Sequence, residues 1–346
     1  TSVTQPATFT LEYVLATQLL SLGVQPAALV GHSVGEFVAA VLAGVMSLKD
    51  AARLVARRGA LMQALPAGVM LSVRLPAQDL LARLPSTLSL AAENGPTACV
   101  AAGPADEIEK LRAALEADGV VAKVLQTSHA FHSAMMEPAV APFEALVREI
   151  ELKAPQRPIY STLTGKLLSA QEATDPNYWA RHLRETVRFS PAVREVMAQL
   201  ASPLFIELGP RNTLAMLVRQ HSPKASAVSV LADKPGEEEH AWRLAAGRLW
   251  TLGAEIDLAS LDTRANKRRL CLPTYPFERK RLWVDIAPTA PALPVSPPDV
   301  AIAADVAAPI QATSTTTAPA HPEPTMTAAA TTDRRPALTQ RLRTLF

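Results

Sequence analysis

The chain has 346 residues, a net charge of +2 at pH 7, 49% hydrophobic residues and 19% charged residues. This composition is that of a globular protein, and the length exceeds an ordinary single domain. The small net charge and the lack of a basic stripe give no electrostatic case for a nucleic-acid partner. Two distant cysteines exclude a disulfide framework or a cysteine-based metal site. We therefore expect a cytoplasmic protein without a metal, a nucleic-acid partner or a membrane span.

The first part of the chain predicts a helix, a strand and two more helices. Apolar residues recur at helical spacing over 8–23, where Gly23 would end the helix. Residues 24–31 form a short apolar run that predicts a strand. Helical spacing returns over 34–46 and again over 48–65.

The junction between that strand and helix has the sequence Gly31-His32-Ser33-Val34-Gly35-Glu36. A strand that turns sharply into a helix crowds the neighbouring Cβ atoms, and glycine two residues on either side of Ser33 relieves the crowding. This arrangement is typical of a nucleophile elbow, with Val34 N–H directed toward a developing oxyanion. A lone Gly-x-Ser-x-Gly also occurs in ordinary loops. The strand before it and the helix after it favour the catalytic interpretation.

Residues 67–126 have a different pattern. Strands alternate with helices in the order β-α-β-β-α-β, which predicts an inserted ferredoxin-like α+β subdomain. The rest, 1–66 and 127–258, is expected to form a hydrolase-like α/β core with a mostly parallel sheet. The predicted subdomain strands are 69–73, 88–92, 98–102 and 120–125, with helices over 78–84 and 106–118. Later core helices are predicted over 135–150, 177–183, 191–199 and 237–252, and strands over 159–163, 204–208 and 227–231.

A serine nucleophile needs a base, and three histidines are candidates. His132 lies in a loop between a strand and a helix, where site residues are common, and His129 in the same loop competes with it. His32 adjoins Ser33, and adjacent side chains at an elbow diverge, so we expect it to support the turn. No aspartate precedes His132 at a suitable spacing. The order of these residues along the chain favours a Ser–His dyad over a hydrolase triad. In such a dyad a backbone carbonyl orients the histidine.

Arg58 follows Arg57 on the predicted helix over 48–65. A buried guanidinium near an acyl-serine would bind a substrate carboxylate through two parallel hydrogen bonds. The other interpretation is a solvated helix face, which is the more common position for any single arginine.

The C-terminal part changes composition. Residues 287–335 are rich in Ala, Pro and Thr and predict a disordered linker. Residues 336–346 regain helical spacing and are interpreted as the start of a following domain. The chain begins with Thr1 and a mid-domain pattern, so we expect it to be cut from something longer.

Six separated segments resemble the acyltransferase domains of modular polyketide synthases, in the malonyl-CoA:acyl carrier protein transacylase family. Their order along the chain makes the resemblance specific, and it extends over about residues 4–283. The segments are Gly31–Glu36, Arg57–Gly59, His129–Ser133, Tyr178–Leu183, Glu207–Pro210 and Leu272–Phe277, the last typical of the linker over 259–286 that follows such domains.

The resemblance implies a role for each matching residue. Ser33 would attack the thioester of malonyl-CoA with His132 as base, and the acyl group would then pass to the phosphopantetheine arm of a carrier protein. The backbone carbonyl of His182 would orient His132, and Arg58 would bind the extender carboxylate. His129-Ala130-Phe131-His132, with Val34 after the serine, accompanies malonyl rather than methylmalonyl. Expected partners are the carrier protein and the adjacent ketosynthase and linker domains, and no cofactor is bound.

One segment of the family pattern is not matched. Family members carry Gly-Gln-Gly-Ser-Gln upstream of the serine, which forms the first strand and contributes a second oxyanion donor. We therefore expect an incomplete sheet and oxyanion hole. Two other functions stay open: an acyl hydrolase or editing acyltransferase, and a catalytically inactive fragment with a structural role in a synthase.

Overall fold

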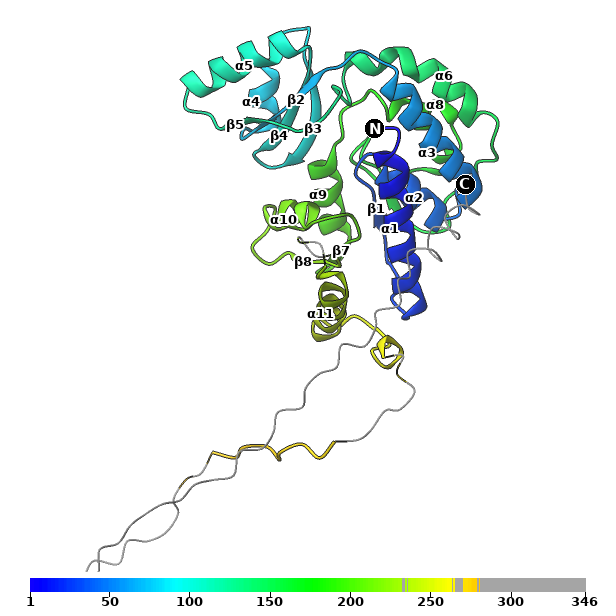
Figure 1. Cartoon of the computed structure of the whole chain (residues 1–346), viewed down its shortest axis with the longest axis vertical. Helices are drawn as coiled ribbons and strands as arrows, with labels where there is room; N and C mark the ends of the chain where they lie inside the picture. The colour runs from blue at the N-terminus through cyan, green and yellow to red at the C-terminus, as the bar shows by residue number, and fades with distance from the viewer. Residues whose placement is uncertain (232–233, 235, 263, 265–269, 279, 281–346) are drawn as a thin grey trace, which may run out of the picture. The chain divides into compact units, whose positions relative to one another are not determined.

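The structure is a computed structural model that describes residues 1–231, 234, 236–262, 264, 270–278 and 280 (Figure 1). The predicted linker over 287–335 and the predicted helix over 336–346 lie outside the described residues. The described residues up to 262 belong to one compact unit, and residues 270–278, without regular secondary structure, belong to another. None of the described helices is long and apolar enough to cross a membrane.

Helices and short parallel strands alternate in the core, as the sequence predicts. In order these elements are α1 (Thr4–Ser21), β1 (Leu29–Val30), α2 (Gly35–Leu42), α3 (Leu48–Gln63), η1 (Ala134–Met136), α6 (Glu137–Val147), β6 (Ile159–Tyr160), α7 (Ala170–Ala173), α8 (Pro176–Arg181), α9 (Phe189–Gln199), β7 (Leu204–Glu207), α10 (Thr213–Arg219), β8 (Ser226–Ser229), α11 (Glu238–Thr251) and η2 (Ala259–Leu261).

Residues 69–124 form the predicted ferredoxin-like subdomain. Its elements are β2 (Val69–Val73), α4 (Ala77–Leu81), β3 (Ser89–Gly95), β4 (Ala98–Gly103), α5 (Ala105–Ala117) and β5 (Ala122–Val124). The four strands are antiparallel in the order β3-β4-β2-β5, and α4 and α5 pack on the sheet (Figure 1). This order is the one that a β-α-β-β-α-β chain gives in ferredoxin-like folds. The predicted fold class is confirmed for this part.

Two separate parallel pairs make up the core sheet. β1 pairs with β6 through Leu29↔Ile159 and Val30↔Tyr160, and β7 pairs with β8 over four residues. Within the described residues, β1 and β7 each have a ladder on one side alone. The predicted strand over 24–31 was too long, because only the two residues that meet β6 are paired.

A cavity of about 570 Å³ lies between these two pairs. Residues 28–30 line one side of it and residues 204–207 line the other, with apolar side chains of α1 and α2 between them. One end of the cavity reaches Gly31, His32 and Gly35. The cavity thus joins the unpaired edges of two strands and ends at the predicted elbow.

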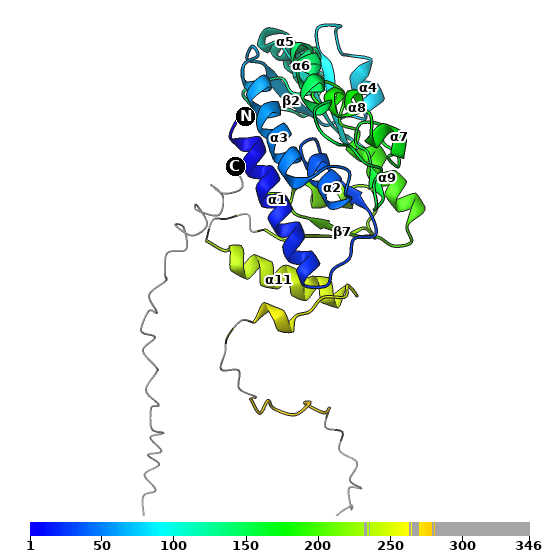
Figure 2. The ribbon, with the colours of Figure 1, turned by 90° about the vertical axis from the view of Figure 1, so that its right-hand side faces the viewer.

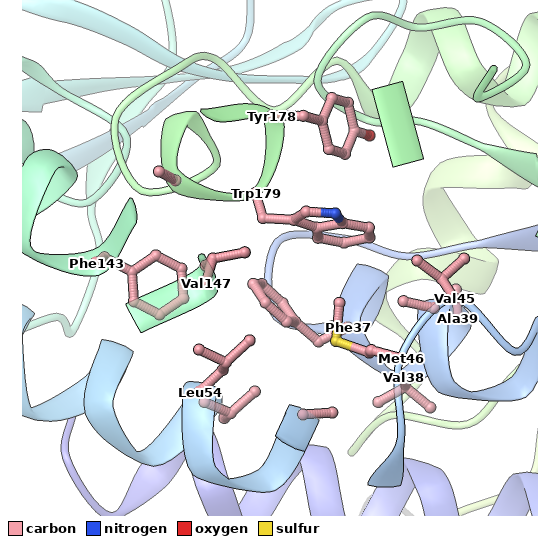
Figure 3. Packing of buried hydrophobic residues seen from close by; sticks show 14 of the residues in the cluster. Phe37, Val38, Ala39, Val45, Met46, Leu54, Phe143, Val147, Tyr178 and Trp179 are labelled. Atoms are coloured by element: carbon pink, nitrogen blue, oxygen red, sulfur yellow. The ribbon is translucent and has the colours of Figure 1, made fainter. Parts of the chain in front are cut away.

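The helix after the elbow is surrounded by apolar side chains. Phe37 on α2 packs against Trp179 of α8, with ring centroids 5.3 Å apart, and against Phe143 of α6 at 6.2 Å (Figure 3). Leu54 of α3 completes this side of the cluster, and α1 packs along α2 and α3 (Figure 2). Apart from Glu36, the side chains of α2 are apolar, and such a helix belongs in a core. The packing therefore fixes α2, and with it the turn at its N-terminus.

Candidate active site

Ser33 occupies a strained turn between β1 and α2. Its backbone has φ of +53°, in the left-handed region that few residues other than glycine adopt. A Cβ on Gly31 would lie 2.1 Å from the Glu36 nitrogen, so no other residue fits there. The Val34 N–H donates no hydrogen bond within the described part of the chain. The turn thus presents Ser33 at the positive end of α2 beside an available backbone donor.

His132 reaches Ser33 from the loop after the ferredoxin-like subdomain. Its Nε2 is 2.8 Å from the Ser33 hydroxyl oxygen, and its Nδ1 is 3.0 Å from the Glu185 carbonyl oxygen. Because a carbonyl oxygen can only accept, Nδ1 carries the proton and Nε2 accepts from Ser33. The His132 N–H donates to the Leu183 carbonyl at 3.3 Å, and φ of His132 is +57°. In the turn after α8, the Glu185 carbonyl therefore orients the imidazole and the Leu183 carbonyl holds the backbone of His132.

The prediction that His182 supplies the orienting carbonyl was wrong. Helix α8 ends at Arg181, and the chain then turns so that the carbonyls of Leu183 and Glu185 face His132. The His182 imidazole is buried, with Nε2 3.2 Å from Glu36 Oε1.

The surroundings of His132 favour its neutral form. Burial lowers its pKa well below the usual 6.5, and the positive charges of Arg58, His32 and His182 lower it further. The hydrogen bond to Glu185 acts in the opposite direction and does not compensate. A neutral imidazole whose Nε2 faces a hydroxyl can take that proton.

Arg58 is buried on the side of α3 that faces Ser33, so the alternative of a solvated helix face was wrong for this residue. One terminal nitrogen donates to Ser33 Oγ at 3.1 Å, and the other donates to Gln5 of α1. Its Nε is buried and has no hydrogen-bond partner, and no acidic side chain pairs with it among the described residues. Burial lowers the pKa of Arg58 to about 10, so it still carries its charge at neutral pH.

The two competing histidines are bound elsewhere. His32 Nε2 lies 2.8 Å from Asn94 Oδ1 of β3, a contact between the elbow and the ferredoxin-like subdomain. His129 contacts Ser128 through Nδ1 at 2.7 Å and the Leu65 carbonyl through Nε2 at 3.1 Å. The His129 ring stacks on Phe131, with centroids 6.0 Å apart. Of the three candidate bases, His132 is the one placed at Ser33.

Sequence reasoning missed the acidic group beneath the elbow. Glu36 is fully buried and accepts hydrogen bonds from Tyr178 and Thr162 as well as from His182. Burial alone would raise the pKa of Glu36, but the charge of His182 and these hydrogen bonds lower it below 4.5 overall. A glutamate inside the apolar helix 34–46 was the signal that could have been used, because buried carboxylates need partners.

A family model described as "Acyl transferase domain" matches residues 1–243. The chain belongs to this acyltransferase family. It is 39% identical over 298 residues to polyketide synthase GfsB of Streptomyces halstedii, covering 82% of this chain and 5% of that protein. It is 36% identical over 286 residues to mycoketide-CoA synthase of Mycobacterium tuberculosis, covering 82% of this chain and 7% of that protein. The acyltransferase thus spans a small part of the length of these relatives.

Solved acyltransferase domains have the same fold. The acyltransferase domain from the second module of the salinomycin polyketide synthase superposes with a TM-score of 0.73 at 37% identity, covering 79% of this chain and 65% of that chain. The acyltransferase domain of SpnD, in complex with 2-(pent-4-yn-1-yl)malonyl, superposes with a TM-score of 0.70 at 35% identity. This match covers 73% of this chain and 62% of that chain. These neighbours confirm the α/β fold class and the resemblance to polyketide synthase acyltransferases.

Proposed function

We propose that this acyltransferase loads a malonyl extender unit from malonyl-CoA onto the phosphopantetheine arm of a carrier protein, through an ester on Ser33. The observation that carries the proposal is Arg58. It is a buried guanidinium without an acidic partner among the described residues, 3.1 Å from the candidate nucleophile. A buried charge is stable only with a partner, so the site favours an acyl group with a free carboxylate. The malonyl-derived group held by the SpnD domain supports the same class of substrate.

The first half-reaction follows from the dyad. His132 Nε2 takes the Ser33 proton as the oxygen attacks the thioester carbonyl, and the Glu185 carbonyl stabilises the imidazolium through Nδ1–H. Val34 N–H donates to the developing oxyanion. Collapse of the tetrahedral intermediate breaks the carbon–sulfur bond, and His132 returns its proton to the CoA sulfur. An ester on Ser33 remains.

In the second half-reaction a phosphopantetheine thiol attacks that ester. His132, neutral again, takes the thiol proton and passes it to the Ser33 oxygen as the ester bond breaks. Neither half-reaction needs a metal or bound cofactor. Transfer differs from hydrolysis only in the acceptor, so the editing or hydrolase alternative is decided by the partition between thiol and water.

The cavity beside the elbow supports a second oxyanion donor as a further part of the proposal. The cavity between β1 and β7 ends at Gly31, His32 and Gly35, and both strands have edges without a ladder there among the described residues. We propose that a further strand, equivalent to the Gly-Gln-Gly-Ser-Gln segment of the family, fits this cavity and adds its donor to Val34. Losing one such donor typically lowers kcat by about a hundredfold or more.

Extender choice is proposed to depend on the loop before His132. Phe131 packs against the apolar cluster around Phe37 and against a second apolar cluster that contains Met70 and Val187. The His129 ring stacks on Phe131. A bulky, braced ring leaves less room for an α-methyl group, which disfavours methylmalonyl. The carrier protein and the adjacent ketosynthase and linker domains of the same synthase complete the proposed set of partners.

The proposal is tested by intact mass after exposure to malonyl-CoA, with Ser33→Ala as the blank. We expect a malonyl adduct on the unsubstituted chain and none on the blank. An adduct that persists in Ser33→Ala would place the nucleophile elsewhere. A protein that stays unlabelled even with the upstream strand supplied would favour the inactive-fragment alternative.

A further inference from the structure

Glu36 sits three residues after Ser33, in the first turn of α2, with every side of its carboxylate bonded. Oε1 accepts from the Tyr178 hydroxyl and lies 3.2 Å from His182 Nε2. Oε2 accepts from the Thr162 N–H at 2.9 Å and lies 2.8 Å from the Thr162 hydroxyl. The carboxylate therefore ties α2 to α8 and to the chain after β6.

His182 is held as firmly as its partner. Its ring stacks on Trp179 with centroids 5.9 Å apart, while Tyr178 and Phe37 present their edges at 5.1 Å and 6.4 Å. Figure 3 shows Trp179 and Tyr178 of α8 on the same side of Phe37. Aromatic packing of this kind leaves the imidazole one orientation, with Nε2 toward Glu36.

The residues that follow His182 hold the candidate base. The Leu183 carbonyl accepts from the His132 N–H, and the Glu185 carbonyl accepts from His132 Nδ1. One end of the Glu36–His182 contact is thus three residues from the nucleophile. The other end, His182, is one residue before Leu183 and three residues before Glu185, whose carbonyls hold His132.

Both catalytic candidates have backbones that need external support. Ser33 and His132 have φ of +53° and +57°, a conformation that costs free energy and persists only where neighbouring structure imposes it. A buried Glu–His pair adds little net stability even when both groups are charged, since desolvation offsets the attraction. The pair between Glu36 and His182 therefore has a better explanation in geometry than in stability.

We propose that Glu36 and His182 are a positioning pair that keeps the Ser33 turn in register with the carbonyls that orient His132. This inference rests on the proposed function for its consequences in catalysis. Neither residue touches the reacting atoms. Without the pair, α8 and α2 can shift relative to each other, and the hydrogen bond between Ser33 and His132 lengthens.

The test follows His132 directly, in the full chain labelled with [¹⁵N]histidine. NMR reports which ring nitrogen of His132 carries the proton, and the His132→Gln variant assigns the signal. We expect one tautomer, protonated at Nδ1, in the unsubstituted protein. Glu36→Gln and His182→Gln should each give mixed tautomers or exchange broadening. The double substitution, which removes both ionisable groups and keeps an amide hydrogen bond, should recover most of the single tautomer.

A second readout is the rate at which a fluorophosphonate probe modifies Ser33. A misplacement of about 1 Å can lower such a rate on the order of 100-fold, which is the loss expected for each single substitution. Tyr178→Phe removes one hydrogen bond to Glu36 without a charge change, so it should give a smaller loss in the same direction if the stronger variants do not fold. His221→Gln is the matched control, because His221 contacts Ser190 at 2.9 Å in α9 and is absent from the dyad.

Replacing His182 also removes one of the groups that lower the pKa of His132. The groups that lower the pKa of His132 by their charge when protonated are Arg58 on α3, His32 at the elbow and His182 after α8. With one of them neutral, the pKa of His132 should rise toward 6.5 in His182→Gln. Single variants that lose thermal stability yet keep the His132 tautomer, its titration and the Ser33 labelling rate would overturn the positioning role. A labelled, single-tautomer protein that never accepts malonyl would instead refute the proposed function.

Discussion

Replacing Arg58 with alanine removes the buried cation beside Ser33. A carboxylate bound to this guanidinium makes two charge-assisted hydrogen bonds, each worth about 1.5–3 kcal/mol. Part of that is offset, because Gln5 and Ser33 already accept from Arg58 before substrate binds. A net loss of about 3 kcal/mol lowers kcat/KM for malonyl-CoA on the order of 100-fold. Acetyl-CoA has no carboxylate, so its kcat/KM should fall by about tenfold at most, through the lost contact with Ser33.

The assay measures acyl-enzyme formation from malonyl-CoA and from acetyl-CoA, each alone and as an equal mixture. The expected result is a fall in the malonyl-to-acetyl preference of at least about tenfold in Arg58→Ala. Arg57→Ala is the control, since the adjacent Arg57 is exposed and should leave the preference unchanged. An Arg58→Ala protein with the original preference would refute the reasoning, because the guanidinium would then not contact the acyl carboxylate.

Three further predictions concern the extender unit, the base and the helix beside the cavity. Phe131→Ser should raise kcat/KM for methylmalonyl-CoA relative to malonyl-CoA by about 10- to 100-fold, because the smaller side chain makes room for one methyl group. An unchanged ratio would show that Phe131 does not determine the choice of extender unit. The pKa of His132 lies well below 6.5 and the neutral imidazole is the base, so kcat/KM should stay level from pH 8 to 6.5 and fall only below that, whereas an acid limb centred at or above 6.5 would contradict the burial argument. Burial and then the charge of Glu207 raise the pKa of Glu12 from 4.5 to about 7. The protonated Glu12 carboxyl therefore contributes fully to the free energy of unfolding below pH 4.5, and this contribution is lost as the pH rises through 7. Glu12→Gln should therefore flatten the fall in unfolding free energy between pH 4.5 and 7, by about 2 kcal/mol after allowance for partial exposure, and identical pH profiles would show that Glu12 is solvated.

Local rules predicted the elbow and the inserted subdomain well. Gly31 and Gly35 relieve crowding at one turn, so the pattern around Ser33 is sufficient to specify it. The alternation of strands and helices over 67–126 likewise depends on short-range periodicity, and the topology follows from the short connections. These are features in which neighbouring residues determine the result.

Features that depend on distant partners were predicted less well. Arg57 and Arg58 are adjacent, and only the packing of α1, which brings Gln5 to Arg58, decides which of them is buried. The orienting carbonyl depends on the conformation of the turn after α8, where a shift of three residues, from His182 to Glu185, changes the acceptor. The length of β1 depends on β6, which is more than a hundred residues away. Such contacts leave no periodic signal in the sequence.

Transfer rather than hydrolysis is the central claim, and the partition of the acyl-enzyme tests it most directly. The full chain would be loaded with malonyl-CoA, freed of excess substrate and divided between buffer and a phosphopantetheinylated carrier protein. Mass spectrometry then follows the malonyl group. The group is expected to leave Ser33 for the carrier thiol and to persist on Ser33 when only water is present. Release as malonate at the same rate in both samples, without a malonyl carrier, would contradict it.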